Sequence, residues 1–370
     1  MKNNRTFLEK LLDGAEVEWK SLGKVTDIKT GQSVSKNIIA QNPGIYPVIN
    51  SGRDPLGFIN EWNTENDPIG ITTRGAGVGS ITWQEGKYFR GNLNYSVTIK
   101  SDYELNVRFL YHVLLHFQKE IHNLCSFTGI PALNASELKK LEIPIPPLSV
   151  QTEIVRILDA LTALTSELTS ELILRQKQYE YYREKLLSFD SLEQLNSGGG
   201  KKKLIDVAKI KNGKDWKHLG EGNIPIYGSG GIMGYVDTYS YDKPTVLIPR
   251  KGTITNIFYL EEPFWNVDTI YYTEINTTQI LPKYFFHFMK TVDLAKLDTG
   301  SGRPSLTQAI LNEIPIFVPP LEQQQRIVSI LDKFETLTNS ITEGLPLAIE
   351  QSQKRYEYYR ELLLNFPGRE

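Results

Sequence analysis

The chain has 370 residues, of which 40% are hydrophobic and 23% are charged, a balance that indicates a folded protein of two domains and excludes a disordered chain. Its 41 Lys and Arg residues against 43 Asp and Glu residues give a formal net charge of -2, which excludes a strongly basic DNA-binding protein. A single cysteine, Cys125, cannot form an internal disulfide, and neither a charged, apolar leader nor a run of about 18 apolar residues is found, so we expect a cytoplasmic protein.

Residues 1–148 are predicted to form a first domain that mixes strands and helices. Short runs of β-forming residues, bounded by glycine and proline, predict strands at residues 46–50, 70–73 and 95–99. A helix is predicted over residues 107–121, and a proline-containing loop follows at 128–134.

A continuous long helix is predicted over residues 149–190. Its apolar residues recur at steps of three and four and therefore lie on one stripe: Ile154, Ile157, Leu161, Leu164, Leu168 and Leu172, continued by Tyr179, Tyr182 and Leu186. About 38 helical residues extend roughly 57 Å at 1.5 Å per residue, which is too long for either domain to bury. Within the stripe the tetrapeptide Thr-Ser-Glu-Leu occurs twice in tandem, at residues 165–168 and 169–172.

A linker at residues 191–200 leads into a second domain, residues 201–320, with a strand at 245–248, a helix at 281–294 and a loop at 299–307. The last segment, 321–370, is predicted to form a second long helix. It repeats the stripe with identical steps: Ile327, Ile330, Phe334, Leu337, Ile341 and Leu345, continued by Tyr356, Tyr359 and Leu363. Because a proline removes a backbone donor, Gly344 and Pro346 predict a break at residues 343–346.

The order of domain, helix, domain and helix arises from an internal duplication. Residues 151–159 share six residues with 324–332 at a constant shift of 173, and Tyr-Glu-Tyr-Tyr-Arg-Glu at 179–184 recurs at 356–361. The domains match more loosely: residues 46–52 parallel 224–230, 71–74 parallel 247–250, and 131–133 parallel 304–306. The duplication predicts two domains of the same fold with different surfaces, related by a pseudo-two-fold.

Two helices with the same apolar spacing most simply pack against each other, antiparallel, as a coiled-coil-like spacer. The alternative is that each stripe rests on its own domain. The tyrosines fit equally the core of a coiled coil and a surface that binds a partner protein. The residues assigned to the spacer or to partner docking are Leu161, Leu168, Tyr179, Tyr182, Leu337, Ile341, Tyr356 and Tyr359.

Loops that carry Gly, Ser, Thr, Arg and Lys in both domains suit DNA, because amides and hydroxyls reach phosphates and Arg forms two hydrogen bonds with guanine. The candidates are Ser51, Gly52, Arg74 and Thr128 in the first domain and Lys214, Lys217, Ser229, Arg250, Lys251, Arg303, Ser305 and Thr307 in the second. For each single Lys or Arg the alternative is a solvated surface charge. Residues 1–148 hold 16 basic and 15 acidic residues and residues 200–320 hold 14 and 12, so partner proteins must supply much of any affinity for DNA.

No catalytic chemistry is predicted. Glycines 75, 77 and 79 lie between two apparent strands and indicate a tight turn, since no helix follows to bind a dinucleotide. His112 and His116 are four residues apart but lack a third ligand, so we expect no metal site. The sequence has neither a phosphate-binding Gly-Lys-Ser/Thr loop nor an Asn/Asp-Pro-Pro-Tyr/Phe motif.

The duplicated segment, Pro-Pro-Leu before a Gln, then Ile-Val-x-Ile-Leu-Asp and Tyr-Glu-Tyr-Tyr-Arg-Glu, resembles the two regions shared by specificity subunits of Type I restriction-modification enzymes. The resemblance spans the whole chain, and residues 11–19, Leu-Leu-Asp-Gly-Ala-Glu-Val-Glu-Trp, are similar to the start of several members. It implies an α+β protein in which two pseudo-symmetric α/β target-recognition domains, 1–148 and 201–320, are separated by two long antiparallel helices.

The resemblance further implies a non-catalytic subunit that recognises a bipartite, asymmetric double-stranded DNA target. The resemblance implies that such a subunit directs two modification (methyltransferase) subunits, which carry S-adenosylmethionine, and restriction subunits, which bind ATP and Mg, in host defence. This chain itself is expected to bind no cofactor, no metal and no membrane. The alternatives are a stand-alone DNA-binding regulator, which the small basic excess disfavours, and a scaffold that clamps proteins without reading DNA.

Overall fold

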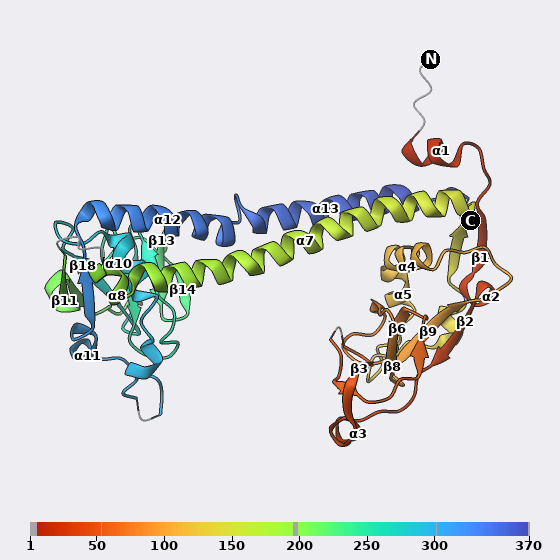
Figure 1. Cartoon of the computed structure of the whole chain (residues 1–370), viewed down its shortest axis with the longest axis horizontal. Coiled ribbons are helices and arrows are strands. Elements are labelled where there is room, and N and C mark those ends of the chain that lie inside the picture. Colours follow the sequence, from red (N-terminus) through yellow and green to blue (C-terminus); the bar gives the residue numbers. More distant parts are fainter. Residues whose placement is uncertain (1–5, 53, 195–198, 301, 369–370) are drawn as a thin grey trace, which may run out of the picture. The chain divides into compact units, whose positions relative to one another are not determined.

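The computed structural model describes residues 6–52, 54–194, 199–300 and 302–368, and it divides into two units (Figure 1). Unit 1 comprises Met1–Glu167 and Ile349–Glu370, and unit 2 comprises Leu168–Ala348. Each unit therefore combines a mixed α/β domain with parts of the long helices. No helix of the described residues is both long and apolar enough to cross a membrane.

Unit 1 contains two four-stranded sheets and one two-stranded sheet. The first has the order β2(Thr26–Thr30), β9(Asn94–Ile99), β6(Ile69–Thr72), β7(Ile81–Trp83) and is antiparallel throughout. The second has the order β4(Phe58–Ile59), β3(Pro43–Ile49), β8(Lys87–Arg90), β5(Thr64–Glu65), with β3 and β8 parallel. β1(Glu18–Ser21) pairs with β10(Glu142–Ile145). The strands predicted at 46–50, 70–73 and 95–99 are confirmed as β3, β6 and β9.

The helices of the first domain are short. They are α1(Phe7–Leu12), α2(Leu22–Val25), α3(Lys36–Gln41), α4(Val107–His116), α5(Gln118–Asn123) and α6(Ala135–Leu138). The single helix predicted at 107–121 is thus two helices that meet at Phe117. The amide side chain of Asn106 accepts from the N–H groups of Arg108 and Phe109 and so begins α4.

Unit 2 repeats this plan. Its larger sheet has the order β12(Ala208–Lys211), β18(Ile270–Ile275), β15(Thr245–Pro249), β16(Phe258–Leu260), and β15 is the strand predicted at 245–248. A second sheet has the order β14(Gly231–Val236), β13(Ile224–Gly228), β17(Trp265–Asn266), and β11(Gly200–Lys203) pairs with β19(Pro315–Val318). The helices are α8(Phe189–Gln194), α9(Leu204–Val207), α10(Pro282–Met289), η1(Leu294–Leu297) and α11(Gln308–Asn312). The helix predicted at 281–294 ends earlier, at Met289. Of the predicted linker 191–200, residues 195–198 lie outside the described residues.

The long helix α7(Leu148–Leu187) is continuous over 40 residues, as predicted. Its first half packs in unit 1 against α13(Leu345–Leu364): the hydroxyls of Thr165 and Ser352 are 2.8 Å apart, and His112 bridges Asp159 to Tyr356. Since residue numbers rise along α7 as they fall along α13, the two helices are antiparallel. In unit 2 the second half of α7 packs against α12(Leu321–Asn339), where the ring of Tyr182 stacks on Phe334 at 5.7 Å (Figure 1). The predicted pairing of the repeated helices is confirmed.

A break in the second copy is confirmed, but it lies at residues 340–344 and not at 343–346 as predicted, because α12 ends at Asn339 and α13 begins at Leu345. Gly344 has φ +88, and a Cβ there would lie 2.6 Å from the carbonyl oxygen of Thr336. Pro346 lies in the first turn of α13, where its missing N–H is not needed. The stripe prediction is wrong at Ile341, which lies in the break and is 78% exposed. Residues 369–370 of the segment predicted as helix lie outside the described residues.

Candidate nucleic-acid interface

Three loops of unit 1 bring candidate residues together. Arg74, after β6, pairs through its backbone with Ala132, and the N–H of Gly75 donates to the carbonyl of Pro131 at 2.9 Å. The loop that carries Thr128 is closed by two hydrogen bonds between Ser126 and Ala132. The carbonyl of Ser51, beside the exposed Gly52, lies next to Gly77, which shares the Arg74 loop. The four candidates of the first domain therefore lie on neighbouring loops.

The same arrangement holds most of the candidates of unit 2. Thr269 lies at the centre of this arrangement. Its carbonyl accepts from the N–H groups of Arg250 and Lys251, and its hydroxyl accepts from the backbone N–H of Ser229. Lys251 pairs through its backbone with Ser305. We define the loop cluster of unit 1 as residues 51–52, 73–77 and 126–132, and that of unit 2 as residues 229–230, 250–252, 298–300 and 302–305.

Asp298 shapes the last loop of the unit 2 cluster. Its carboxylate accepts from the N–H groups of Gly300 and Ser305, both at 2.8 Å, and these backbone hydrogen bonds lower the pKa of Asp298. Arg303 lies on this loop and is exposed. The loop thus presents a cation while its own carboxylate is used to hold the backbone.

The hydrogen bonds correct one sequence match by one residue. Thr73 donates its N–H to the residue before β9 and accepts from Leu133, and Arg250 donates to Thr269 and accepts from Leu306 in the same way. The equivalent of Arg74 is therefore Lys251, and not Arg250 as the match of 71–74 with 247–250 predicted. Side chains alternate between the two faces of a strand, so an alignment that is wrong by one residue assigns each side chain to the wrong face. Loose sequence similarity is not enough to exclude such an error.

Three candidates of the second domain lie outside the cluster. Lys214 and Lys217 belong to a loop after β12, where the N–H of Lys214 donates to Asn266 and its carbonyl accepts from the indole of Trp265. Thr307 caps α11, because its hydroxyl accepts from the N–H of Ile310. The O–H of Thr307 can still donate to a phosphate, because a hydroxyl accepts and donates at the same time, so its predicted contact with DNA stays a prediction.

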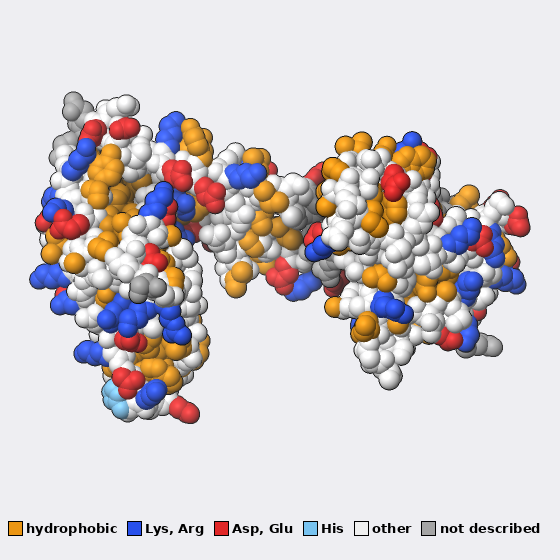
Figure 2. Space-filling view, turned by 90° about the horizontal axis from the view of Figure 1, so that it is seen from below, with side chains coloured by type: hydrophobic (Ala, Val, Ile, Leu, Met, Phe, Trp, Pro, Cys, Tyr) orange, Lys and Arg blue, Asp and Glu red, His pale blue; other side chains and the backbone are white. Residues whose placement is uncertain are grey.

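Charge is mixed over the face of the molecule that Figure 2 shows. Figure 2 shows Lys and Arg side chains scattered with Asp and Glu side chains between them on both units. Within the unit 2 cluster, the Lys251 ammonium is 3.9 Å from the Asp268 carboxylate. Sequence reasoning missed two apolar residues on the Thr128 loop, Phe127 and Ile130, which are 53% and 70% exposed and for which only the loop position was a signal.

The residues assigned to the helices fall into two groups. Tyr179 is buried and Leu161, Leu168, Leu337 and Tyr356 are partly buried, whereas Tyr182 and Tyr359 are 41% and 38% exposed. Each exposed tyrosine forms an edge-to-face pair with its neighbour, Tyr181 or Tyr358, which is more exposed still. These two tyrosine pairs are equivalent in the duplication, and sequence reasoning missed their outer members.

Each domain is attached to its long helix by a buried glutamine. The amide of Gln151 on α7 accepts from the N–H of Asn106 and donates to the carbonyls of Glu104 and Pro146. Gln324 on α12 makes the same three hydrogen bonds, with Leu281, Gln279 and Pro319. Both side chains are fully buried, and every polar atom of each amide has a partner in this frame.

A second buried polar contact is also repeated. His112 on α4 contacts Asp159 of α7 and Tyr356 of α13, and His287 on α10 contacts Asp332 of α12 and Tyr179 of α7. Burial lowers the pKa of both histidines, although the adjacent carboxylates oppose this. His116 has different surroundings: its ring lies 3.4 Å from the Glu361 carboxylate, and burial lowers its pKa as well.

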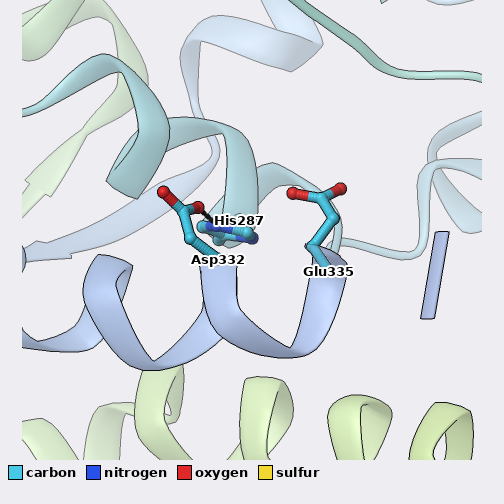
Figure 3. Close-up of side chains that lie close together, drawn as sticks. All are labelled: His287, Asp332 and Glu335. Carbon is cyan, nitrogen blue, oxygen red and sulfur yellow. Dashed lines mark hydrogen bonds and ion pairs between the residues drawn. The ribbon is translucent and has the colours of Figure 1, made fainter. Parts of the chain in front are cut away.

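His287, Asp332 and Glu335 form a candidate metal-binding group, since their ligand atoms lie within 4.8 Å of one another (Figure 3). Both ring nitrogens of His287 already have partners, and Lys283 lies 2.8 Å from the second oxygen of Asp332. An ammonium ion bound to a carboxylate disfavours a cation at the same atom. The position equivalent to Glu335 in unit 1 is Thr162, so the group as a whole is not duplicated.

The two related α/β domains, their loop clusters and the paired helices define a class of protein that recognises a target. The family model for the Type I restriction modification DNA specificity domain matches residues 15–175 and 196–351. The chain belongs to this family, and it is a specificity subunit that recognises DNA and is not an enzyme.

The relatives cover the full chain. An Escherichia coli protein, the type I restriction enzyme EcoR124I/EcoR124II specificity subunit, is 33% identical over 98% of this chain and 97% of its own length. A Haemophilus influenzae protein assigned as a type I restriction enzyme specificity subunit is 43% identical over 99% of this chain and all of its own length. The crystal structure of the Type-I restriction-modification system S subunit from M. genitalium has a TM-score of 0.64 at 24% identity, covering 96% of this chain and 98% of that chain, which shows the same fold.

Proposed function

We propose that each unit reads one half of a bipartite, asymmetric double-stranded DNA target through its loop cluster. The observation that carries this proposal is that one hydrogen-bond frame holds different side chains in the two units. Arg74 stands where unit 2 has Lys251, Thr73 where it has Arg250, and Ala132 where it has Ser305. Side chains that differ at the same place in the frame select different bases, so the two halves of the target differ.

In this proposal residues 1–148 and 201–320 are the target-recognition domains, 149–190 and 321–370 are the spacer helices, and 191–200 is the linker. Two modification subunits, carrying S-adenosylmethionine, dock on the equivalent tyrosine pairs 181–182 and 358–359. Restriction subunits with ATP and Mg then join the complex. The duplicated, exposed tyrosine pairs support two equivalent docking sites, because tyrosine is enriched at protein interfaces.

The test compares Arg74→Ala with Lys251→Ala in the complex of this chain with its modification subunits. Methylation mapping of genomic DNA is expected to show a target in two separated halves. Each variant should lose discrimination roughly tenfold or more at bases of one half only, and the two variants should affect opposite halves.

Lys243→Ala is the matched control, because Lys243 is an exposed lysine of unit 2 outside the loop cluster. It should leave both halves unchanged. A single contiguous target, or relaxation of the same bases by both variants, would contradict the proposal.

A further inference from the structure

A chain of hydrogen-bonded groups joins three helices in each unit. In unit 1 the Tyr356 hydroxyl is 3.2 Å from Nδ1 of His112, and Nε2 of His112 is 2.8 Å from Asp159, which also accepts from Arg108. The domain helix α4 is thereby tied both to α7 and to α13.

The same chain recurs in unit 2 with the helices exchanged. The Tyr179 hydroxyl is 3.3 Å from Nδ1 of His287, Nε2 of His287 is 3.0 Å from Asp332, and Lys283 lies 2.8 Å from the other oxygen of that carboxylate. Here the domain helix α10 is tied to α7 and to α12. Only the cation differs in type, since Lys283 stands where unit 1 has Arg108.

The direction of each chain of hydrogen bonds follows from its chemistry. An ionised carboxylate only accepts, so Nε2 of each histidine carries the hydrogen and donates to Asp159 or Asp332. With its pKa lowered by burial the ring is neutral, so Nδ1 has no hydrogen and accepts from the tyrosine hydroxyl. Burial raises the pKa of Tyr179 to about 12 and also raises that of Tyr356, so both hydroxyls keep their hydrogen. Each ring thus has one arrangement in which both nitrogens are satisfied.

Apolar contact alone would not fix the angle between the domain helix and the long helices. Side chains such as Ile154 and Leu158 of α7 bury apolar surface, and that gain depends little on the exact angle between helices. A buried hydrogen bond, by contrast, is lost when donor and acceptor move apart by a fraction of an ångström or lose alignment. A histidine held from both sides therefore specifies one angle and one register between three helices.

We infer that these two groups, Tyr356–His112–Asp159 and Tyr179–His287–Asp332, are orientation clamps: they fix the angle of each target-recognition domain on its helix pair and so restrict the gap between the halves of the DNA target. The inference rests on the proposed function. The clamp residues are positioning residues, because they lie outside both loop clusters and act through α4 and α10.

The test uses Tyr179→Phe and Tyr356→Phe, each in the complex with modification subunits. The controls are Tyr239→Phe in unit 2 and Tyr103→Phe in unit 1, which remove a hydroxyl outside the clamps, the loop clusters and the tyrosine pairs. The measurement is the distribution of gap lengths among methylated sites, together with the base preference in each half. A role in folding alone would change the total amount of methylation without changing this distribution.

Each clamp variant is expected to raise methylation of sites whose gap is one base pair too short or too long by about threefold to tenfold, the equilibrium equivalent of one lost hydrogen bond. Base preference in both halves stays unchanged, and the two controls keep the wild-type gap. Asp332→Asn provides a second variant should Tyr179→Phe lower the melting temperature of the chain.

An unchanged gap distribution in the clamp variants would overturn the inference, as would a change of base preference without a change of gap. Failure of the proposed function has a different signature, because the wild-type complex would then show no target in two halves at all.

Discussion

Gln151 and Gln324 show how a single residue attaches a domain to a helix. Each lies in the first turn of its long helix, and its amide replaces the missing partners of two carbonyls and one N–H in the turns around it. These backbone groups are partly or fully buried, so they are costly to leave without a partner. Glutamine is needed at this position because its amide supplies partners to these backbone groups, and both copies of the duplication keep it.

At this scale we predict that Gln324→Leu lowers the free energy of unfolding by about 3 kcal/mol. Three backbone groups lose their buried partner, while the volume of the side chain changes little. Urea-induced unfolding, followed by the helical circular dichroism signal, measures the change. The neighbouring Gln325→Leu is the control, since Gln325 is exposed, and it should change stability by less than about 0.5 kcal/mol. Equal effects of the two substitutions would show that the hydrogen bonds of Gln324 contribute little.

The long helices differ because of a few residues. α7 contains no glycine or proline and runs through 40 residues, whereas the second copy is interrupted where Gly344 adopts a left-handed conformation. In place of this break, α7 carries the tandem Thr-Ser-Glu-Leu repeat. The first copy of the repeat is therefore one continuous helix, whereas the second copy is divided into α12 and α13.

At the scale of the element we predict that deleting residues 169–172 narrows the gap in the DNA target by one or two base pairs. Four residues fewer shorten a helix by roughly 6 Å and rotate its C-terminal part by about 40°, and a base pair rises by roughly 3.4 Å. Methylation mapping of the variant complex measures the new gap. Ser170→Ala, an exposed substitution inside the same repeat, should keep the original gap, and a deletion variant that also keeps it would refute α7 as a ruler.

The charge of the whole molecule bears on how it binds DNA. Both domains carry only a small basic excess, and acidic residues exceed basic ones in the helical segments. Each neutralised phosphate needs a cation, so we expect this chain alone to neutralise few phosphates of the DNA backbone. We therefore propose that this chain recognises the sequence and that partner subunits supply much of the affinity for the DNA backbone.

At the scale of the molecule we predict that DNA binding by the isolated chain is weak and depends only shallowly on salt. We expect a slope of log Kd against log salt concentration that corresponds to about four neutralised phosphates or fewer. Once the modification subunits are bound, the slope should correspond to several more phosphates. Fluorescence anisotropy of a labelled duplex at several salt concentrations measures both slopes, with the modification subunits alone as the control. A slope for the isolated chain as steep as that of the complex would contradict this division.

The sequence by itself determined the duplication, the two long helices with a break at Gly344, several central strands and the family. These features depend on local rules: apolar spacing along a helix, the backbone limits of glycine and proline, and identical residues at a constant shift. The sequence also placed Gln151, Asp159 and Tyr179 in the repeat, but it could not show what they contact.

Only the tertiary structure decided which residues meet. The contact of His112 with Tyr356 joins positions 244 residues apart, and no spacing rule in a sequence predicts such a contact. Arg74 and Lys251 are equivalent positions in the two units, one residue away from the match that the sequence predicted. Hydrogen bonds between strands and loops show this equivalence, and loose sequence similarity between divergent domains does not. Likewise the exposure of Ile341, predicted to lie in the apolar stripe, depends on where α12 ends. In each case the deciding interactions connect distant segments, whose geometry is set only when the whole chain packs.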